Sequence, residues 1–565
     1  MKYDWTCQAA AGAALLLLGS MSGTALAASS LSHPGEDVAS SLPQAQAEVQ
    51  PQKPEGEAAQ PPVSFTITNF RLEAPELYLD KAELTRILQD GMGEKKTMAK
   101  LNETLNQLTA YCRRNGYPAA AAYVPAQESR DGMIVIKVIP GRYGEVRFDN
   151  QSNMKEKTAR GFVNGLKSGQ IIRTHDLESA LYGISDVSGT RAVGVLSPGR
   201  EFGTSDLTVR IEKGKGSNTV LYVENYGSQN SGRYRYGLQE NLYDVGGSGG
   251  KISAGTLISN AHMHNYYANY EALVGHGGTT LGFGYSRMDY KVGGRLRSLG
   301  ANGVADTVSL FGSRPLYHYA DSGMTFRYGY DYRDLDDDLT SYRTSYRDMD
   351  SQKHSHSVHA GVTGFMREDG LLLNYEAKAT TGTMVMDSAH AQLMDTVMGG
   401  KTGGRFTKGE INVSAVQRLG NRSDVLFKAS GQIASHNLDG SEEMYLGGSS
   451  GVRAYPQGEG SGDEGILATV EARYYTHVPG LVASTFFDAG HIRYRNDGGM
   501  DSLGMGRGVP SSGETLKGWG LGLAYNRPDD WFARLDYARR IGSDPNLSAA
   551  ARAKGRTWFM LGKIW

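Results

Sequence analysis

The chain has 565 residues, 74 of them Gly and 32 Tyr, and its 59 basic and 60 acidic side chains leave a formal charge of −1. This balance excludes a global basic field, so it does not favour nucleic acid as a partner. The two cysteines exclude a disulfide-built scaffold. A mean hydropathy of −0.42 excludes a bundle of membrane helices.

The N-terminus has the organisation of a secretory signal peptide. Lys2 supplies a positive charge, residues 9–18 form a short apolar core, and Ala25-Leu26-Ala27 ends in small residues. A membrane anchor needs about 20 apolar residues, roughly twice this core. We therefore expect residues 1–27 to be removed, which leaves Cys112 as the only cysteine and allows no intramolecular disulfide.

Residues 28–62 are rich in Ala, Gln, Pro and Ser and show no apolar periodicity. Pro51, Pro54, Pro61 and Pro62 break any helix, so we expect a disordered or extended linker. For the same reason, a helix that could plug a pore is not evident in this segment.

Residues 63–140 and 141–215 read as two copies of one small α/β unit, with the order strand, helix, helix, strand, strand. In the first copy, 65–70 alternates as a strand, and Asp80 with Glu83 forms a capping box before a helix. Gly116 ends a second helix. Such a unit leaves a sheet edge open, and an open edge can accept another extended chain. A mere spacer is the alternative interpretation of these residues.

From about Gly216 to Trp565 the sequence alternates with a period of two. Large apolar side chains such as Trp519, Leu521 and Leu523 alternate with glycines or with charged residues, and aromatic residues mark strand ends. This pattern is typical of a transmembrane antiparallel β-barrel with lipid outside and water inside. Residues 216–565, 350 in all, accommodate about sixteen strands. The fold class is thus mainly β, a barrel preceded by two α/β domains.

Several patterns resemble ligand sites without meeting their requirements. Gly246–Lys251 has Val245 and Ile252 where a phosphate loop needs Gly and Ser or Thr, so we expect a hairpin turn. A calcium-loop spacing has Leu339 in place of the turn Gly, and we expect a solvated loop there: Asp334, Asp336 and Asp338. Two His pairs, 262/264 and 354/356, lack a third ligand. We expect no metal, no cofactor and no catalytic set.

One long loop, around 445–465, carries a distinctive motif. The loop contains Val452-Arg453-Ala454-Tyr455. The second strand that follows the loop contains Phe486, Asp488 and Gly490 in a Phe-x-Asp-x-Gly pattern. Here the sequence resembles the two-partner secretion transporters, the haemolysin secretion/activation family of the POTRA-plus-barrel superfamily. The loop motif of that family is Val-Arg-Gly-Tyr, so Ala454 replaces a Gly whose backbone freedom the fold could require.

The resemblance implies a function and the contact that serves it. The two α/β units become POTRA domains, 63–140 and 141–215, which would bind a large, repeat-rich exoprotein in the periplasm. The loop would fold into the lumen, where Arg453 would meet Asp488, a suitable partner for a forked guanidinium. The final strand, ending in Trp565, would be recognised by the barrel-assembly machinery, and the barrel would sit in outer-membrane lipid.

Other functions remain open at this point. A barrel-insertion factor of the same superfamily usually carries more POTRA repeats. A passive porin or receptor leaves residues 63–215 without a role, and a barrel enzyme lacks catalytic residues.

Overall fold

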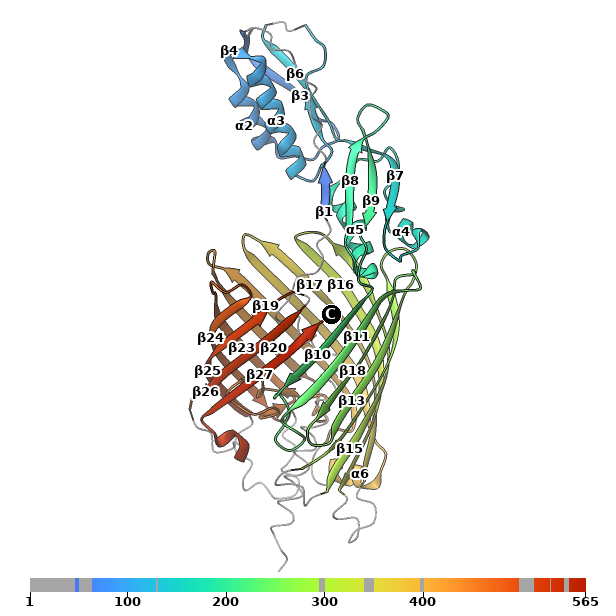
Figure 1. Cartoon of the computed structure of the whole chain (residues 1–565), viewed down its shortest axis with the longest axis vertical. Helices are drawn as coiled ribbons and strands as arrows, with labels where there is room; N and C mark the ends of the chain where they lie inside the picture. The colour runs from blue at the N-terminus through green and yellow to red at the C-terminus, as the bar shows by residue number, and fades with distance from the viewer. Residues whose placement is uncertain are drawn as a thin grey trace, which may run out of the picture.

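The computed structural model describes residues 46–49, 64–128, 131–293, 300–339, 350–396, 401–496, 513–528, 530–542 and 548–565. The expected signal peptide and most of the expected linker lie outside the described residues. Two α/β units follow one another at one end of a wide barrel, and the chain ends in a strand of the barrel wall (Figure 1). Within the described residues, no helix combines the length and the apolar character needed to cross a membrane.

The first α/β unit packs two helices on a three-stranded sheet. Helix α2 (Lys81–Gly91) and helix α3 (Met98–Arg114) bury apolar stripes against strands β3 (Asn69–Glu73), β5 (Ala121–Tyr123) and β6 (Met133–Ile139). Asp80 caps α2 by accepting from the Ala82 N–H, while Glu83 binds Arg86 instead of closing the expected capping box. The expected strand 65–70 is split into β2 (Ser64–Ile67) and β3, and β2 pairs with an unexpected strand, β4 (Gly93–Thr97). The sequence of β4, Gly-Glu-Lys-Lys-Thr, has no apolar alternation that could reveal it.

The second unit repeats this plan. Strand β7 (Arg142–Asn150) is followed by helices α4 (Glu156–Val163) and α5 (Thr174–Ser188) and by strands β8 (Ala192–Pro198) and β9 (Thr204–Ile211). In both units the first strand pairs in parallel with the last one, and the last two strands are antiparallel. The expected order of elements is therefore present in both copies.

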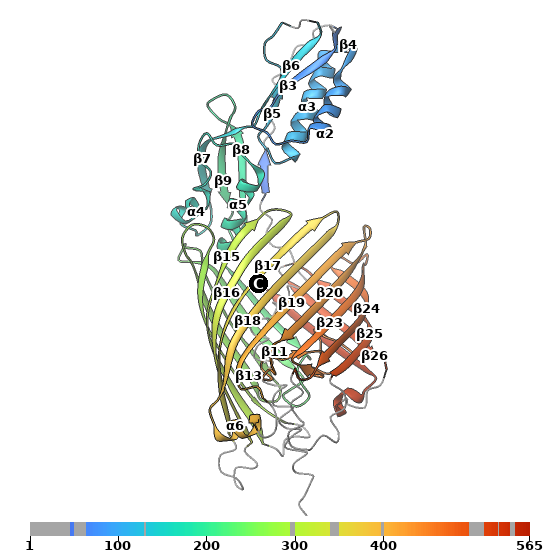
Figure 2. The same ribbon diagram turned by 180° about the vertical axis from the view of Figure 1, so that it is seen from behind.

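Part of the expected linker is a strand. Strand β1 (Gln46–Val49) adds to the edge of the second sheet, parallel to β8, with Gln46 opposite Val193 and Val49 opposite Leu196. Figures 1 and 2 both show it beside β8, between the first unit and the barrel. In the second unit, the sheet edge at β8 is thus occupied by the chain itself.

Sixteen antiparallel strands close the barrel, and the first strand pairs with the last through Val220 opposite Ile564. The strands are β10 (Ser217–Glu224), β11 (Arg235–Val245), β12 (Gly250–Ser259), β13 (Met263–Leu273), β14 (Thr280–Lys291), β15 (Ala301–His318), β16 (Ser322–Leu339), β17 (Ser351–Glu368), β18 (Leu371–Met386), β19 (Gly404–Arg418), β20 (Ser423–Ala434), β23 (Glu464–Tyr475), β24 (Leu481–Arg493), β25 (Gly513–Asn526), β26 (Trp531–Arg540) and β27 (Gly555–Ile564). Closure leaves no lipid-exposed edge in this sheet.

The two faces of the wall differ as the alternation predicts. Outward side chains such as Trp519, Leu521 and Leu535 are 43–56% exposed, whereas inward ones such as Glu471, Asp488 and Asp536 are at most 3% exposed. A sheet with apolar residues outside and buried charges inside matches a bilayer around a polar lumen.

The structure shows where two of the ligand-like sequence patterns lie. Residues 246–249 form the tight turn between β11 and β12, as expected for Gly246–Lys251. Asp334, Asp336 and Asp338 do not lie in a loop, because β16 runs on through them to Leu339. Strands β15 to β17 each have 18 residues, while a bilayer needs about 9–11 per tilted strand, so these strands continue beyond the apolar band and can carry such charges. Helix α6 (Ala389–Thr396) lies at the end of the barrel opposite the α/β units (Figure 2).

Candidate functional site: the lumen loop and its wall partners

The connection between β20 and β23, residues 435–463, folds into the barrel. It begins ten residues before the loop expected around 445–465, and its two limbs are joined by a short ladder of β21 (Met444–Tyr445) with β22 (Ser461–Gly462). The tip lies beyond that ladder. Its apolar residues form one buried cluster with inward residues of β24, β25 and β26: Leu446, Val452, Ala454, Tyr455, Phe486, Ile492, Leu516 and Ala538.

The tip is a compact turn held by its own backbone. Val452 N–H donates to Leu446 O at 2.7 Å, and Tyr455 N–H donates to Val452 O at 3.1 Å. The indole N–H of Trp558, on β27, donates to Arg453 O at 2.6 Å. Because Val452, Ala454 and Tyr455 are at most 3% exposed, the tip presents its arginine to the wall from a fixed backbone.

Arg453 and Asp488 are in direct contact. The Arg453 Nε and Nη2 groups donate to the two Asp488 carboxylate oxygens at 3.0 and 2.9 Å, and the Arg453 backbone N–H donates to the same carboxylate at 3.1 Å. Thr469 Oγ1 donates to Asp488 Oδ1 at 2.9 Å. Two parallel bonds from one guanidinium give the forked geometry that a lysine cannot reproduce.

Two further carboxylates and a second arginine complete the cluster. Arg453 Nη1 donates to Glu471 Oε2 at 3.0 Å and lies 3.5 Å from Asp536 Oδ2. Arg534 binds both of these carboxylates, at 3.1 Å and 2.8 Å. Without Arg453, the wall residues Arg534, Asp488, Glu471 and Asp536 carry a net charge of −2, which favours a cationic tip. Arg534 and Asp536 alternate with outward residues of β26 such as Leu535 and Tyr537, and the pairing of β24, β25 and β26 in the curved wall brings them to Arg453.

The remaining motif residues shape the wall. The Arg453 guanidinium carbon lies 3.2 Å from the centre of the Phe486 ring, a cation–π contact. A Cβ at Gly490 would lie 2.7 Å from Leu446 Cδ2, and one at Gly518 would lie 2.6 Å from Ala454 Cβ. Ala454 is not among the residues with positive φ, so the replacement of Gly in the loop motif causes no backbone strain. Its methyl group fits because the opposing wall residue is a glycine.

The arrangement can act as a latch. Its donors, acceptors and buried charges form ion pairs that can break and form again. Removal of one partner from a buried pair typically costs about 3–5 kcal/mol because the other charge is left unpaired, so loss of either Arg453 or Asp488 should destabilise the seated loop.

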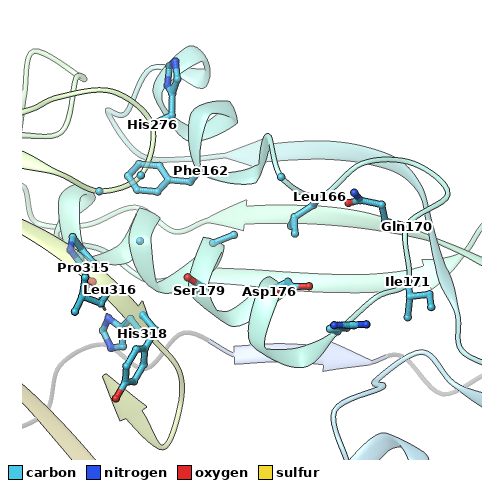
Figure 3. A pocket seen from close by; sticks show the side chains of 18 of the residues that line it. Phe162, Leu166, Gln170, Ile171, Asp176, Ser179, His276, Pro315, Leu316 and His318 are labelled. Atoms are coloured by element: carbon cyan, nitrogen blue, oxygen red, sulfur yellow. Dashed lines mark hydrogen bonds and ion pairs between the residues drawn. The ribbon is translucent and has the colours of Figure 1, made fainter. Parts of the chain in front are cut away.

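A second site lies between the second α/β unit and the barrel. A cavity of about 640 Å³ is lined by residues of α4 and α5, by the β13–β14 turn at His276 and by the end of β15 at Pro315 and His318 (Figure 3). His318 Nδ1 lies 2.8 Å from Asp186 Oδ2, and the His318 ring stacks on Tyr182 at 4.4 Å. Desolvation at this joint raises the pKa of Glu178, whose carboxylate accepts the Ala320 N–H. These contacts connect the unit firmly to the barrel.

The other patterns show no ligand geometry. His354 pairs with Asp387 and His356 with Tyr330, at 2.8 and 2.6 Å. His264 pairs with Asp289 at 2.8 Å. Across the part of the chain that the structure describes, no three His, Cys, Asp or Glu residues are grouped to hold a metal.

Comparison with known proteins gives concordant results. Residues 65–141 match the ShlB-type POTRA domain, and residues 203–513 match the haemolysin secretion/activation protein ShlB/FhaC/HecB. The heme/hemopexin transporter protein HuxB of Haemophilus influenzae is 26% identical over 471 residues, 82% of this chain and 81% of that protein. The outer membrane transporter CdiB of Dickeya dadantii is 21% identical over 454 residues, 76% of each chain.

Solved structures show the same fold. CdiB from Escherichia coli superposes with a TM-score of 0.68 at 18% identity, covering 97% of this chain and 98% of that one. BamA from Haemophilus ducreyi lacking POTRA domains 1–3 gives 0.53 at 14% identity, covering 89% and 100%. The match over 203–513 includes the lumen-loop motif and the Phe-x-Asp-x-Gly strand. The chain therefore belongs to the haemolysin secretion/activation (ShlB/FhaC/HecB) family of outer-membrane two-partner secretion transporters, with its POTRA units in the periplasm.

Proposed function

We propose that this transporter captures an unfolded exoprotein on its POTRA sheet edges and passes it through the barrel, with Arg453 holding the lumen loop closed between export events. The observation that carries the proposal is the two-bond contact between Arg453 and Asp488, made from inside a closed barrel. A loop held at a buried charged site occupies lumen that a polypeptide must use.

The recognition step rests on the sheet edges. Among the described residues, β5 pairs with β6 alone, so its other side has no strand partner in the first unit. The Ala122 N–H of β5 donates to Thr109 Oγ1 of α3 at 3.0 Å. In the second unit the β8 edge carries β1. An extended exoprotein segment can add to β5 when the Ala122 N–H leaves Thr109, and to β8 only when β1 leaves.

Export in this proposal needs no enzymatic step. Folding of the exoprotein outside the cell biases its movement, because a folded chain cannot return through the barrel. The cargo that fits this route is long and repetitive, so that each emerging segment folds on the previous one.

The experiment is co-expression with a large, repeat-rich secreted protein encoded next to the gene, followed by assay of that protein in the medium. We expect secretion with the native chain and a strong loss with Arg453→Ala inserted at equal levels. If secretion is unchanged without the transporter while insertion of other outer-membrane barrels fails, the chain is an assembly factor instead. The BamA resemblance is one of fold, which that factor would share.

A further inference from the structure

A second group of buried charges lies at the base of the same loop. The first limb carries three acidic residues, Asp439, Glu442 and Glu443; Glu443 lies 3.5 Å from Arg495, and the other two are 8% and 4% exposed. Three cations from the inner wall face Asp439 and Glu442: Arg333 on β16, Lys353 on β17 and Lys408 on β19, each at most 9% exposed. None of these residues belongs to the loop motif or to the Phe-x-Asp-x-Gly strand.

The contacts are short and specific. Lys353 Nζ lies 2.5 Å from Asp439 Oδ2. Arg333 Nη1 and Lys408 Nζ lie 2.7 and 2.9 Å from the two Glu442 carboxylate oxygens. Lys408 also lies 3.7 Å from Glu410 on its own strand, so Glu442 is its nearer partner. Asp439 and Glu442 therefore each bind a wall cation at hydrogen-bond distance.

Backbone contacts fix this limb independently of the tip. Leu438 N–H donates to Asp463 Oδ1 at 3.0 Å, and Arg495 Nη1 donates to Leu438 O at 2.9 Å. Gln432, on β20, donates from its side chain to both Glu442 O and Asp463 O at 3.0 Å. The limb would thus keep these contacts if Arg453 left its own site.

The charges at the two sites are reversed, and the strands differ. At the tip, a loop cation binds acidic residues of β23, β24 and β26. At the base, loop anions bind cations of β16, β17 and β19. A loop segment shifted along the wall would meet charge of its own sign at either site, so the pattern fixes one position in the lumen.

We propose that Asp439 and Glu442, with Arg333, Lys353 and Lys408, form a separate ionic anchor that keeps the base of the loop in the lumen after the tip is released. Release of Arg453 then swings the tip about the base, and full clearance of the lumen requires that both sites open. These five residues are positioning residues for the loop. The existence of the anchor does not depend on the proposed gating role; only its importance for export rests on that role.

The test measures loop position directly, without any exoprotein. Leu438 is 1% exposed and interacts through its backbone, so Leu438→Cys reports whether the base is seated. A membrane-impermeant maleimide is added to whole cells, and the native chain, whose Cys112 is buried, is the blank. Heat-modifiable migration on gels confirms that each variant is a folded barrel.

We expect Arg453→Ala to leave the Leu438→Cys labelling rate unchanged, and Lys353→Ala or Asp439→Ala to raise it about tenfold or more. The exchange Lys353→Asp with Asp439→Lys should restore protection, because it keeps an opposite pair in place. Arg473→Ala is the matched control: it removes an inward wall cation that binds Asp424 on the neighbouring strand and not the loop, and it should change nothing.

Either of two results would overturn the anchor. In the first, Arg453→Ala exposes Leu438→Cys as fully as Asp439→Ala does, which would mean that the tip alone holds the loop. In the second, the single base variants leave the rate unchanged, or the exchanged pair fails to restore protection in a folded barrel. Export is assayed separately. If the loop proves irrelevant to export, the proposed gating role is refuted, and the labelling result alone decides whether the anchor exists.

Discussion

At the scale of single residues, Arg453 and Asp488 act as one contact. We expect Arg453→Ala and Asp488→Ala each to reduce export strongly, and the double variant to cost much less than the sum of the two. The double-mutant cycle should show a coupling of roughly 0.5–3 kcal/mol, as for residues that share one interaction. Arg453→Lys should restore export only in part, since a point charge cannot make both bonds to Asp488. Secretion that survives both single changes in a properly inserted barrel would contradict the role.

The close approach of Ala454 to Gly518 supplies a second residue-scale prediction. A Cβ at Gly518 would lie 2.6 Å from Ala454 Cβ, so Gly518→Ala should unseat the tip and lower export. Ala454→Gly removes the clashing methyl group, and the double variant should recover export. Gly431→Ala is the control, because its nearest neighbour, Ile411 Cγ2, lies 3.4 Å away. If the double variant is no better than Gly518→Ala, the tip does not pack as described.

The thiol of Cys112 allows a simple check of the first POTRA unit. Cys112 is fully buried, and desolvation raises its pKa to about 11. At pH 8 only about one thiol in a thousand would be ionised, and the thiolate is the reactive species. We expect a disulfide reagent to modify Cys112 only in denaturant. Rapid modification of the folded protein at pH 8 would show that this helix face is not packed against the sheet.

The family resemblance of the two motifs predicts the contact between Arg453 and Asp488, whereas local sequence pattern predicts only the face of the strand on which Asp488 lies. Phe486, Asp488 and Gly490 share a face because a strand alternates, which is a local property. Glu471, Asp536 and Trp558 reach Arg453 only because the consecutive strands β23 to β27 curve around the folded-in loop in one register, which the alternation of a single strand does not reveal. Asp439 and Lys353, 86 residues apart, could not be paired by local pattern for the same reason.

At the scale of elements, strand β1 shows where local patterns are insufficient. The surrounding prolines and polar residues predict a linker, yet 46–49 pairs with β8 because that edge offers free backbone donors and acceptors. The barrel strands, by contrast, follow directly from their alternation. Element type is thus predictable where one face of a strand meets lipid, and not where pairing involves the backbone alone.

The position of β1 has a testable consequence for cargo binding. Ala47→Pro with Glu48→Pro removes two backbone N–H donors and should weaken the pairing of β1 with β8. If β8 also receives an exoprotein segment, the full-length variant should bind the exoprotein several-fold more tightly, because a competing occupant has been removed. Ala47→Gly with Glu48→Gln keeps the donors and serves as control. Unchanged or weaker binding would place cargo recognition elsewhere, with β5 the first alternative.

At the scale of the whole molecule, the POTRA units and the barrel divide the work. Recognition requires sheet edges, and the barrel has none after closure; conduction requires a closed wall, which the units lack. Deletion of 63–215 should therefore abolish export while the barrel still inserts and conducts ions across a planar bilayer. The deletion also removes two contacts between the second unit and the barrel, of Asp186 with His318 and of Lys155 with Gly247. Asp186→Ala removes one of these contacts and keeps the sheet edges, so it separates loss of exoprotein binding from loss of contact with the barrel. If that single variant exports normally and the deletion does not, the units act by binding cargo; export by the deleted chain would mean that the barrel alone selects it.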